Sequence, residues 1–453
     1  METSLFLRTA FLDERYKIFL HSDLGKLYKA IPFESLAEPF RKHLPRGKQG
    51  VRPLFTLEGG LGLMFLKHYL KISDSKLVER INSDWQMQMF CGVYIRFYKP
   101  IKDRDLVGRW RRFFANHMEM NVLQEKLANH WVSHMKKTEV LMNDATVYES
   151  DIRYPTDVKL LWESTEWIFS KIEWIGKLTD QKIPRSKYGD QKVKQDAYGK
   201  RRRKTKSQTR QRRKALLFWL DRGLEILQGL LNGYGYSVDF LGKQFFNRLR
   251  TIKEVLFQQQ YLYDTDSTSI ANRIVSLAKP YLRPIVRGKE NKRVEFGAKV
   301  NASQVDGINF IEHFSFDAFN ECTRVKKAVW THNKLFEKCE QFAGDQIYAT
   351  NKNRKHLTKK GVVTNFRRKG RPPKDDASAQ QIRKQLGKVR ATVLEGSFGT
   401  EKNHYLLKKV AARTEQTEKA WIFFGIHTAN AVRIAARIDK AEKSKTQPLR
   451  KAA

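Results

Sequence analysis

The chain has 453 residues, of which 87 are Lys or Arg and 48 are Asp or Glu, so its formal net charge at pH 7 is +39. Hydrophobic residues make up 41% and aromatic residues 12%, which is enough for a large core and excludes a disordered basic tail. The positive excess makes a phosphate backbone the expected partner, because Lys and Arg that neutralise phosphates release condensed counterions.

The sequence gives no sign of membrane insertion or secretion. The longest apolar stretch, at 216–231, is interrupted by three charged residues and is too short to span a bilayer. The N-terminus lacks a basic segment followed by an apolar core, so we expect a cytoplasmic, nucleoid-associated protein. The cysteines are far apart, which favours buried thiols over zinc or disulfides; they are Cys91, Cys322 and Cys339.

Residues 5–122 have apolar residues at helical spacing, with Gly and Pro between the segments. Ser73 is placed to cap one of the short helices. Two short helices joined by a tight turn can form a helix-turn-helix that enters a DNA groove, but a helical bundle or a dimerisation face gives the same pattern. We therefore predict an all-helical N-terminal domain, residues 1–125, for DNA binding or dimerisation.

The pattern changes to a buried strand at 138–148, which contains Asp144. From 154 to 284 it is helical again, with leucines along one face. A dense basic run interrupts this region at 200–206, and because like charges repel, we predict a solvated loop or helix end there. A polyanion is its expected ligand, although a solvated face that binds nothing specific fits the same composition. The residues expected to bind DNA here are Arg201, Arg202, Arg203 and Lys204.

Strand signals return at 294–300 and 308–316, with Asp306 and Gly307 between them as a hairpin turn. A helix is expected next at 319–336. The segment 341–349 is expected to form a short strand that runs out at Gly344 and Asp345. A helix at 351–359 and a strand at 362–364 should follow. This order predicts a mixed α/β fold, in which helices cover a sheet.

A basic Pro/Gly segment follows at 366–373 and includes Arg367 and Arg368. It is either a plain connector or a segment that lies in an A·T-rich minor groove. The next stretch, 378–437, is mainly helical, and we expect a flexible tail at 436–453. Three residues of this stretch recur at seven-residue spacing, which places them on one face of a helix; they are Glu395, Lys402 and Lys409.

Three motifs, in this order, resemble those of the DDE transposases of bacterial insertion sequences. The first is Asn-Asp-Ala-Thr at 143–146, the second is Gly-Asp-Gln-Ile-Tyr at 344–348 with Asn353 and Arg354 after it, and the third is Glu-Gly-Ser-Phe-Gly-Thr-Glu-Lys at 395–402. The resemblance covers most of the chain. Further matching segments lie at 152–157, 287–289 and 295–300.

The resemblance implies an RNase H-like catalytic domain at 135–435, with a long, mostly helical basic insertion at 156–285. It also implies that Asp144, Asp345 and Glu395 are catalytic and bind two Mg²⁺ ions, for which Mn²⁺ can substitute. The implied reaction is hydrolysis at the ends of the element, followed by attack of the 3′-hydroxyls on target DNA.

The implied partner is double-stranded DNA, both the element ends and the target. Since two ends must meet at one target, we expect a homodimer or a higher oligomer during the reaction, and no membrane partner. Lys402 is expected to hold a phosphate near the cut. Further expected DNA contacts are Lys409, Asn353 and Arg354.

The sequence departs from the family pattern before the glutamate. The family often has a tyrosine and an arginine seven and four positions earlier, where this chain has Lys388 and Ala391. Arg390 is one position away, and a regular α-helix would turn it off the face of Glu395.

Three other interpretations fit parts of the sequence. A nuclease of the same fold would share the carboxylates but not join strands. A catalytically inactive DNA-binding protein derived from a transposase would act through its charge alone. Taken singly, an Asp at a strand end is often a turn former, and a Glu among lysines is often a surface ion pair.

Overall fold

The computed structural model describes residues 10–44, 54–234, 239–286, 294–370 and 377–446. The chain forms two compact units, the first from Met1–Asp151 with Gly297–Ala453 and the second from Ile152–Phe296. The first unit contains both the predicted N-terminal helices and the strand of Asp144, and the second spans the predicted insertion. The matching segment at 287–289 and parts of the predicted segments at 366–373 and 436–453 lie outside the described residues.

Every described element before the first strand is a helix, as predicted. Ser22, Thr56 and Ser73 each accept a backbone N–H from the first turn of the helix that follows, so short polar side chains set these helix starts. The helix at Leu57–Leu70 is buried nearly all round, which favours the helical-bundle alternative over an exposed helix-turn-helix. The helices are α2 Ala10–His21, α3 Asp23–Lys29, α4 Phe33–Arg41, α5 Leu57–Leu70, α6 Asp74–Ile81, α7 Trp85–Phe90, α8 Leu106–His117, α9 Met120–Trp131 and η1 Val132–His134.

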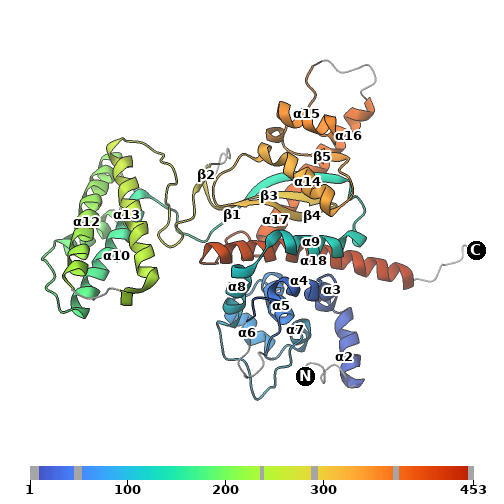
Figure 1. Ribbon diagram of the computed structural model, residues 1–453, viewed down its shortest axis with the longest axis horizontal. Helices are drawn as coiled ribbons and strands as arrows, with labels where there is room; N and C mark the ends of the chain where they lie inside the picture. The colour runs from blue at the N-terminus through green and yellow to red at the C-terminus, as the bar shows by residue number, and fades with distance from the viewer. Residues whose placement is uncertain (1–9, 45–53, 235–238, 287–293, 371–376, 447–453) are drawn as a thin grey trace, which may run out of the picture. The chain divides into compact units, whose positions relative to one another are not determined.

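A long C-terminal helix, α18 (Glu415–Thr446), packs against α3, α5 and α8 and also against strand β4 (Ile308–Ser315). Figure 1 shows these N-terminal helices and the sheet on opposite sides of α18. The prediction of a tail from residue 436 was wrong, because α18 continues to Thr446. Ion pairs along its last turns help to hold it, including Lys29 with Glu442 at 2.9 Å and Asp439 with Lys443 at 2.8 Å.

The sheet is mixed: β3 pairs with both β1 and β4, and β5 lies between β1 and β6. β1 and β3 are antiparallel, β3 and β4 form the predicted hairpin, and β1, β5 and β6 are parallel. Asp306 and Gly307 have φ values of 47° and 78°, as the hairpin turn requires. The remaining strand, β2, pairs with the first residues of β3 within the second unit. The strands are β1 Val140–Glu149, β2 Pro284–Val286, β3 Val294–Val305, β4 Ile308–Ser315, β5 Gln341–Ala343 and β6 Val363–Thr364.

Helices cover both faces of this sheet, which confirms the predicted mixed α/β architecture. Neighbouring residues of β1 point to opposite faces, so Leu141 packs in one buried cluster and Met142 in another. The Leu141 cluster includes residues of α14 and α15, and the Met142 cluster includes residues of α16 and α17. The elements are η3 Glu321–Arg324, α14 Val325–Leu335, η4 Gln346–Tyr348, α15 Asn351–Lys359, α16 Ala377–Val389, η5 Arg390–Leu394 and α17 Glu395–His404.

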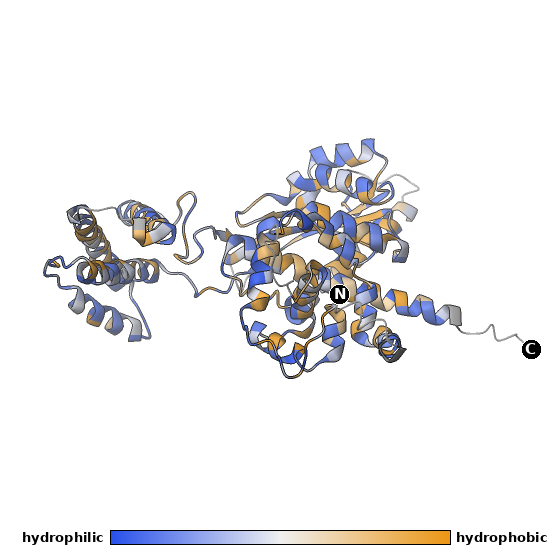
Figure 2. Cartoon of the chain, turned by 60° about the horizontal axis from the view of Figure 1, so that its bottom comes forward, coloured by the Kyte–Doolittle hydropathy of each residue, from blue (hydrophilic) through white to orange (hydrophobic). Residues whose placement is uncertain are grey.

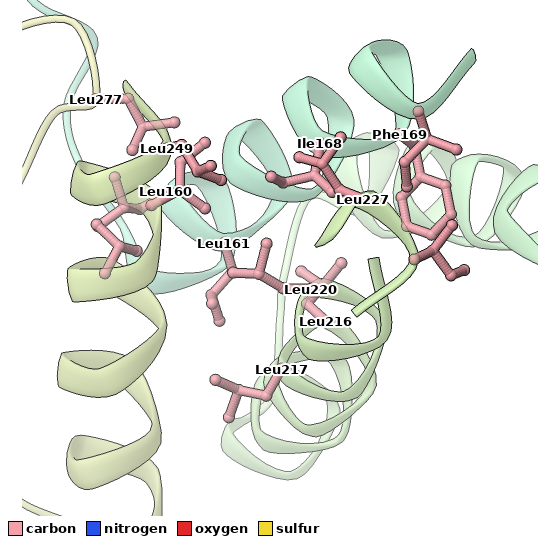
Figure 3. Packing of buried hydrophobic residues seen from close by; sticks show 14 of the residues in the cluster. Leu160, Leu161, Ile168, Phe169, Leu216, Leu217, Leu220, Leu227, Leu249 and Leu277 are labelled. Atoms are coloured by element: carbon pink, nitrogen blue, oxygen red, sulfur yellow. The ribbon is translucent and has the colours of Figure 1, made fainter. Parts of the chain in front are cut away.

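The second unit is a helical bundle with its own core. Leucines of α12 pack against apolar residues of α10 and α13, which confirms the predicted leucine face (Figure 3). A capping box between Thr205 and Gln208 starts α12. Residues 201–205 of the basic run therefore form an exposed loop between the ends of α11 and α12, as predicted. The helices are α10 Asp157–Leu178, α11 Tyr188–Lys200, α12 Lys206–Gly233, η2 Asp239–Leu241 and α13 Gly242–Asp264.

Hydropathy follows the packing in each unit. Figure 2 shows hydrophobic residues where elements pack together and hydrophilic residues on the outward faces of the helices. Across the described ranges, no helix combines the length and the apolar character that crossing a membrane requires.

Candidate active site

The two predicted catalytic aspartates follow paired positions of neighbouring parallel strands, with Asp144 inside β1 and Asp345 in the turn after β5. Met142 of β1 is paired with Ala343 of β5. Asp144 comes two residues after Met142, and Asp345 comes two residues after Ala343. Asp144 is half-buried and accepts the Ala145 N–H at 2.8 Å, whereas Asp345 is exposed and accepts the Gln346 N–H at 2.5 Å. The register therefore brings the two residues to the same end of the β1–β5 pair.

Tyr348 is a buried residue whose hydroxyl lies near the carboxylates at this end of the sheet. Burial raises the pKa of its hydroxyl well above the usual range, and nearby carboxylates raise it further. These carboxylates are, in decreasing effect, Glu321, Asp144, Glu312 and Asp345. Both predicted aspartates thus lie close enough to one buried hydroxyl to affect it.

Asn365, which the sequence reasoning missed, fixes the backbone next to Asp345. Its side chain accepts the Gly344 N–H at 3.0 Å and donates to the Gly344 carbonyl at 2.9 Å. A Cβ at residue 344 would lie 3.0 Å from the Tyr348 ring and 3.1 Å from the Phe342 ring. The close ring contacts explain why glycine precedes the aspartate.

Arg390 connects the first and third predicted carboxylates. Its Nη1 lies 2.8 Å from Oδ2 of Asp144 and 3.1 Å from Oε1 of Glu395. The side chains of Arg390 and Asp144 are 15% and 17% exposed, while that of Glu395 is 52% exposed. Asp144 on β1 and Glu395 on α17 therefore converge on a single cation.

A π-helix explains how Arg390 reaches this position. Residues Arg390–Leu394 form η5, a π-helical turn between α16 and α17, in which the Glu395 N–H donates to the Arg390 carbonyl. Because residues five apart align in a π-helix, Arg390 lies on the face of Glu395. The expectation that a helix would turn Arg390 off this face was wrong, because it assumed regular α-helical geometry.

The spacing of the apolar residues in the sequence indicates the π-helix, whose turn is wider than that of an α-helix. Leu386 and Val389 are three apart, and Leu394 and Phe398 are four apart, as in an α-helix. The interval between Val389 and Leu394 is five, yet all four side chains pack in the same cluster. An interval of five in an otherwise helical stripe therefore indicates the π-helix.

Burial dominates the electrostatics of Asp144 and raises its pKa to about 6. The hydrogen bond from Ala145 and the charge of Arg390 oppose this rise, and the charges of Glu321 and Glu395 add to it. A carboxyl with this pKa is mostly ionised at pH 7. It can therefore act as a charged ligand at neutral pH.

The two predicted lysines have different settings. Lys402 lies on α17, and its Nζ is 2.8 Å from Oγ1 of Thr146, two residues after Asp144 on the same face of β1. The prediction that Lys409 continues this helical face was wrong, because α17 ends at His404. Lys409 lies in the following loop and pairs with Glu149 at 3.0 Å.

The other predicted DNA contacts differ in exposure. Asn353 is 4% exposed, and its amide donates to the carbonyls of Cys322 and Tyr348 at 2.7 and 2.9 Å. The buried amide of Asn353 therefore binds the protein backbone and is not exposed for the predicted DNA contact. Arg354 is half-buried and donates to the Ala349 carbonyl at 3.0 Å. The exposed residues are Arg201, Arg202, Arg203 and Lys204 in the second unit, and Arg367 and Arg368 in the first.

The donor set suits divalent cations, although the carboxylates are not gathered as a trio. Among the described residues, no group of three or more His, Cys, Asp and Glu side chains is close enough to hold a metal ion. Asp144 and Glu395 nevertheless supply the oxygen ligands that Mg²⁺ prefers, and they already share one cation, the Arg390 guanidinium. Asp345 lies on the neighbouring strand end.

Two family models match parts of the chain. A model described as Transposase DDE domain matches residues 342–429, which include Asp345 and Glu395. A second, described as Transposase domain (DUF772), matches residues 14–113 in the N-terminal helices. Asp144 and the whole second unit lie outside both matches. No curated protein and no solved structure matches the chain.

Proposed function

Because the chain belongs to the DDE transposases of insertion elements, we propose that it binds the ends of its element and moves them into new DNA. In this proposal it hydrolyses phosphodiester bonds at the ends and joins the exposed 3′-hydroxyls to target DNA by transesterification. The convergence of Asp144 and Glu395 on one cation, with Asp345 at the adjacent strand end, is the observation that carries the proposal.

Asp144, Asp345 and Glu395 would hold two Mg²⁺ or Mn²⁺ ions. Such ions, when bound, activate the attacking oxygen and stabilise the leaving oxygen. The chain's own part is to fix the carboxylates: β1 and β5 place the aspartates, and the π-helix turns Arg390 toward both Asp144 and Glu395. Arg390 offsets the repulsion between these two carboxylates before DNA arrives.

Lys402 is suited to hold a phosphate oxygen of the cut strand. It lies on the helix of Glu395 and beside the strand of Asp144, so it borders the carboxylates from both elements. Its ammonium is a compact point charge of the kind that binds phosphates. We propose that it positions the DNA backbone rather than taking part in proton transfer.

The strand order supports an RNase H-like catalytic fold for the first unit. One carboxylate lies on β1, between the antiparallel β3–β4 hairpin and the parallel strands β5 and β6. The exposed loop Arg201–Lys204 and the exposed Arg367 and Arg368 would bind the backbone of double-stranded DNA. We further propose a homodimer or higher oligomer at the paired ends, associated with the nucleoid.

The proposal is tested with labelled duplexes that carry the terminal sequences of the element. Purified protein is incubated with these duplexes and a target plasmid in Mg²⁺ or Mn²⁺, and the wild type is compared with Asp144→Asn. Asp221→Asn is the matched control, since Asp221 is an exposed carboxylate on α12. We expect metal-dependent cleavage and joining in the wild type and in the control, and neither in Asp144→Asn.

The other outcomes separate the alternatives. Cleavage without joined products would support a nuclease of the same fold. DNA binding that ignores the metal, without cleavage by any of the proteins, would support an inactive DNA-binding protein. Cleavage by Asp144→Asn at the wild-type rate would remove Asp144 from the site.

A further inference from the structure

The loop between α7 and α8, residues 91–105, can be followed in Figure 1. Two of its aromatic side chains are largely exposed to solvent. Phe97 is 89% exposed and Tyr98 is 65% exposed. Among the large hydrophobic residues that the structure describes, Phe97 is the most exposed. An aromatic ring that stays in water does not gain the free energy of burial. The exposure of two adjacent rings therefore suggests that they contact a partner.

The loop is fixed at its base rather than loosely exposed. The buried amide of Gln88 accepts the Ile95 N–H at 3.0 Å and donates to the Ile81 carbonyl at 2.9 Å. The amide of Asn82 binds both the N–H and the carbonyl of Ile101, at 2.8 and 3.0 Å. Two side-chain amides thus hold the loop on either side of its tip.

The tip itself is a closed turn. The Lys99 N–H donates to the Arg96 carbonyl at 2.9 Å, and this bond encloses Phe97 and Tyr98. Arg96 donates to the Tyr98 hydroxyl at 3.0 Å, and the two rings meet edge to face at 5.3 Å between centroids. The backbone turn and the ring contact therefore restrict the conformations of the tip before any partner binds, which lowers the entropy cost of binding.

Charge indicates which partner fits the tip. Arg96 and Lys99 border the two rings, and Lys102 follows. The acidic residues of the loop, Asp103 and Asp105, lie at its end and pair with Arg109 and Arg112 of α8. Aromatic rings among cations suit single-stranded or distorted nucleic acid, where bases stack on the rings and phosphates pair with the cations. Lysine is depleted in protein–protein interfaces, so Lys99 and Lys102 beside the rings favour a polyanion over a protein partner.

We propose that this aromatic tip, residues 96–99, stacks on unpaired or unstacked bases of DNA through Phe97 and Tyr98, while Lys99 and Lys102 contact the flanking phosphates. The ligand class is DNA whose base stack is open, such as a strand end or a distorted step. This inference rests on the proposed function, because a transposase handles DNA ends, and it adds a base-contacting site in the N-terminal helices.

The test uses three variants of the full chain. Phe97→Ala/Tyr98→Ala removes both rings, and Phe97→Trp/Tyr98→Trp keeps stacking surface. Phe218→Ala is the matched control, because Phe218 is 61% exposed on α12. Each protein is titrated into a duplex with a short single-stranded end that carries 2-aminopurine, whose fluorescence reports unstacking. Anisotropy of a second label gives the affinity, and circular dichroism checks folding.

We expect the double alanine variant to bind this DNA about 10- to 100-fold more weakly, in line with the loss of one or two stacked bases. It should also lose the 2-aminopurine response, while the tryptophan variant and Phe218→Ala keep both. A fully paired continuous duplex should show a smaller difference between the proteins. This pattern would support the tip as a base-stacking site.

Two results would overturn the inference, and they are distinguishable from failure of the proposed function. If the wild type binds and cleaves DNA, and the folded double alanine variant matches it in affinity and fluorescence, the aromatic tip is not a base contact although the function stands. If this variant instead changes only the oligomeric state in size-exclusion chromatography, the tip is a protein contact. A wild type that binds no DNA at all would contradict the proposed function first.

Discussion

The carboxylate site and the basic loop of the second unit hold their charges in opposite ways. At the site, Asp144 and Glu395 share Arg390 at 2.8 and 3.1 Å, and burial raises the pKa of Asp144 to about 6. In the loop, the side chains of Arg201–Lys204 are exposed and adjacent in sequence. Paired, half-buried charge fixes geometry, whereas exposed like charge attracts a polyanion without fixing it.

In the proposed function, the carboxylate site carries out the chemistry and the basic loop supplies affinity for DNA. Changes at the carboxylates should therefore abolish cleavage and leave DNA binding largely intact. Changes in the basic loop should weaken binding for every DNA sequence and alter its dependence on salt. Variants of the two regions test whether cleavage and DNA affinity are separable in this way.

The largest effect is expected at the other two carboxylates. Asp345→Asn and Glu395→Gln should each lower the rate of end cleavage by at least about 100-fold, since each removes a charged oxygen ligand that the proposed mechanism requires for its metal ions. Gel assays of cleavage under single-turnover conditions measure the rate, and anisotropy measures DNA affinity. Asp221→Asn should cleave like the wild type. A variant that loses affinity in parallel with rate would contradict the division of roles.

A smaller but general effect is expected from the basic loop. Replacing Arg201, Arg202, Arg203 and Lys204 by Ala should weaken duplex binding by about 100-fold near 0.1 M salt, if the four side chains contact phosphates. The slope of log K against log salt should become shallower by about 3 to 4.

The matched control for the loop makes the same change of charge at scattered exposed lysines of the second unit, namely Lys177, Lys182, Lys192 and Lys253. An equal loss in this control would show that net charge, not the loop, provides the affinity. Filter binding at several salt concentrations distinguishes the two results.

The smallest effect concerns stability and pH. Burial raises the folded-state pKa of Asp144 from 3.8 to about 6, so its protonated form favours folding at low pH. That contribution is full below pH 3.8 and is lost as the pH rises through 6. In metal-free buffer, Asp144→Asn should match the wild type near pH 4 and exceed its unfolding free energy by about 1 to 3 kcal/mol at pH 8.

Urea titrations with EDTA at both pH values measure this difference. Asp221→Asn should show no gain that depends on pH. An Asp144→Asn variant that is less stable than the wild type at pH 8 would mean that the Arg390 pair outweighs the cost of burying the carboxylate.

The sequence predicted every strand of the sheet except β2, because the signals of the other strands are local. Apolar and β-branched residues marked β1 as a buried strand, and Asp306-Gly307 marked the hairpin of β3 and β4. The three acidic positions came from motif resemblance, since an isolated Asp or Glu carries no local signal of catalysis. The helices before β1 followed in the same way from apolar spacing.

What the sequence reasoning missed depends on irregular or long-range geometry. The position of Arg390 requires a π-helix, whose trace is one interval of five in an apolar stripe. The clamp of Asn365 on Gly344 joins residues that are 21 positions apart. Lys409 was placed on a helical face because a seven-residue spacing does not show where α17 ends. Local sequence patterns were therefore enough to predict most helices and strands, whereas the arrangement of the candidate site depends on tertiary contacts.

The convergence of Asp144, Asp345 and Glu395 on bound metal is the central claim, and iron-directed cleavage of the polypeptide tests it most directly. The protein is loaded with Fe²⁺ in the presence of end DNA and treated with ascorbate and peroxide, so that radicals cut the backbone near the ion. We predict cuts near all three residues that Mg²⁺ suppresses and that vanish in Asp144→Asn. Cuts confined to other regions, or an unchanged pattern in Asp144→Asn, would contradict the claim.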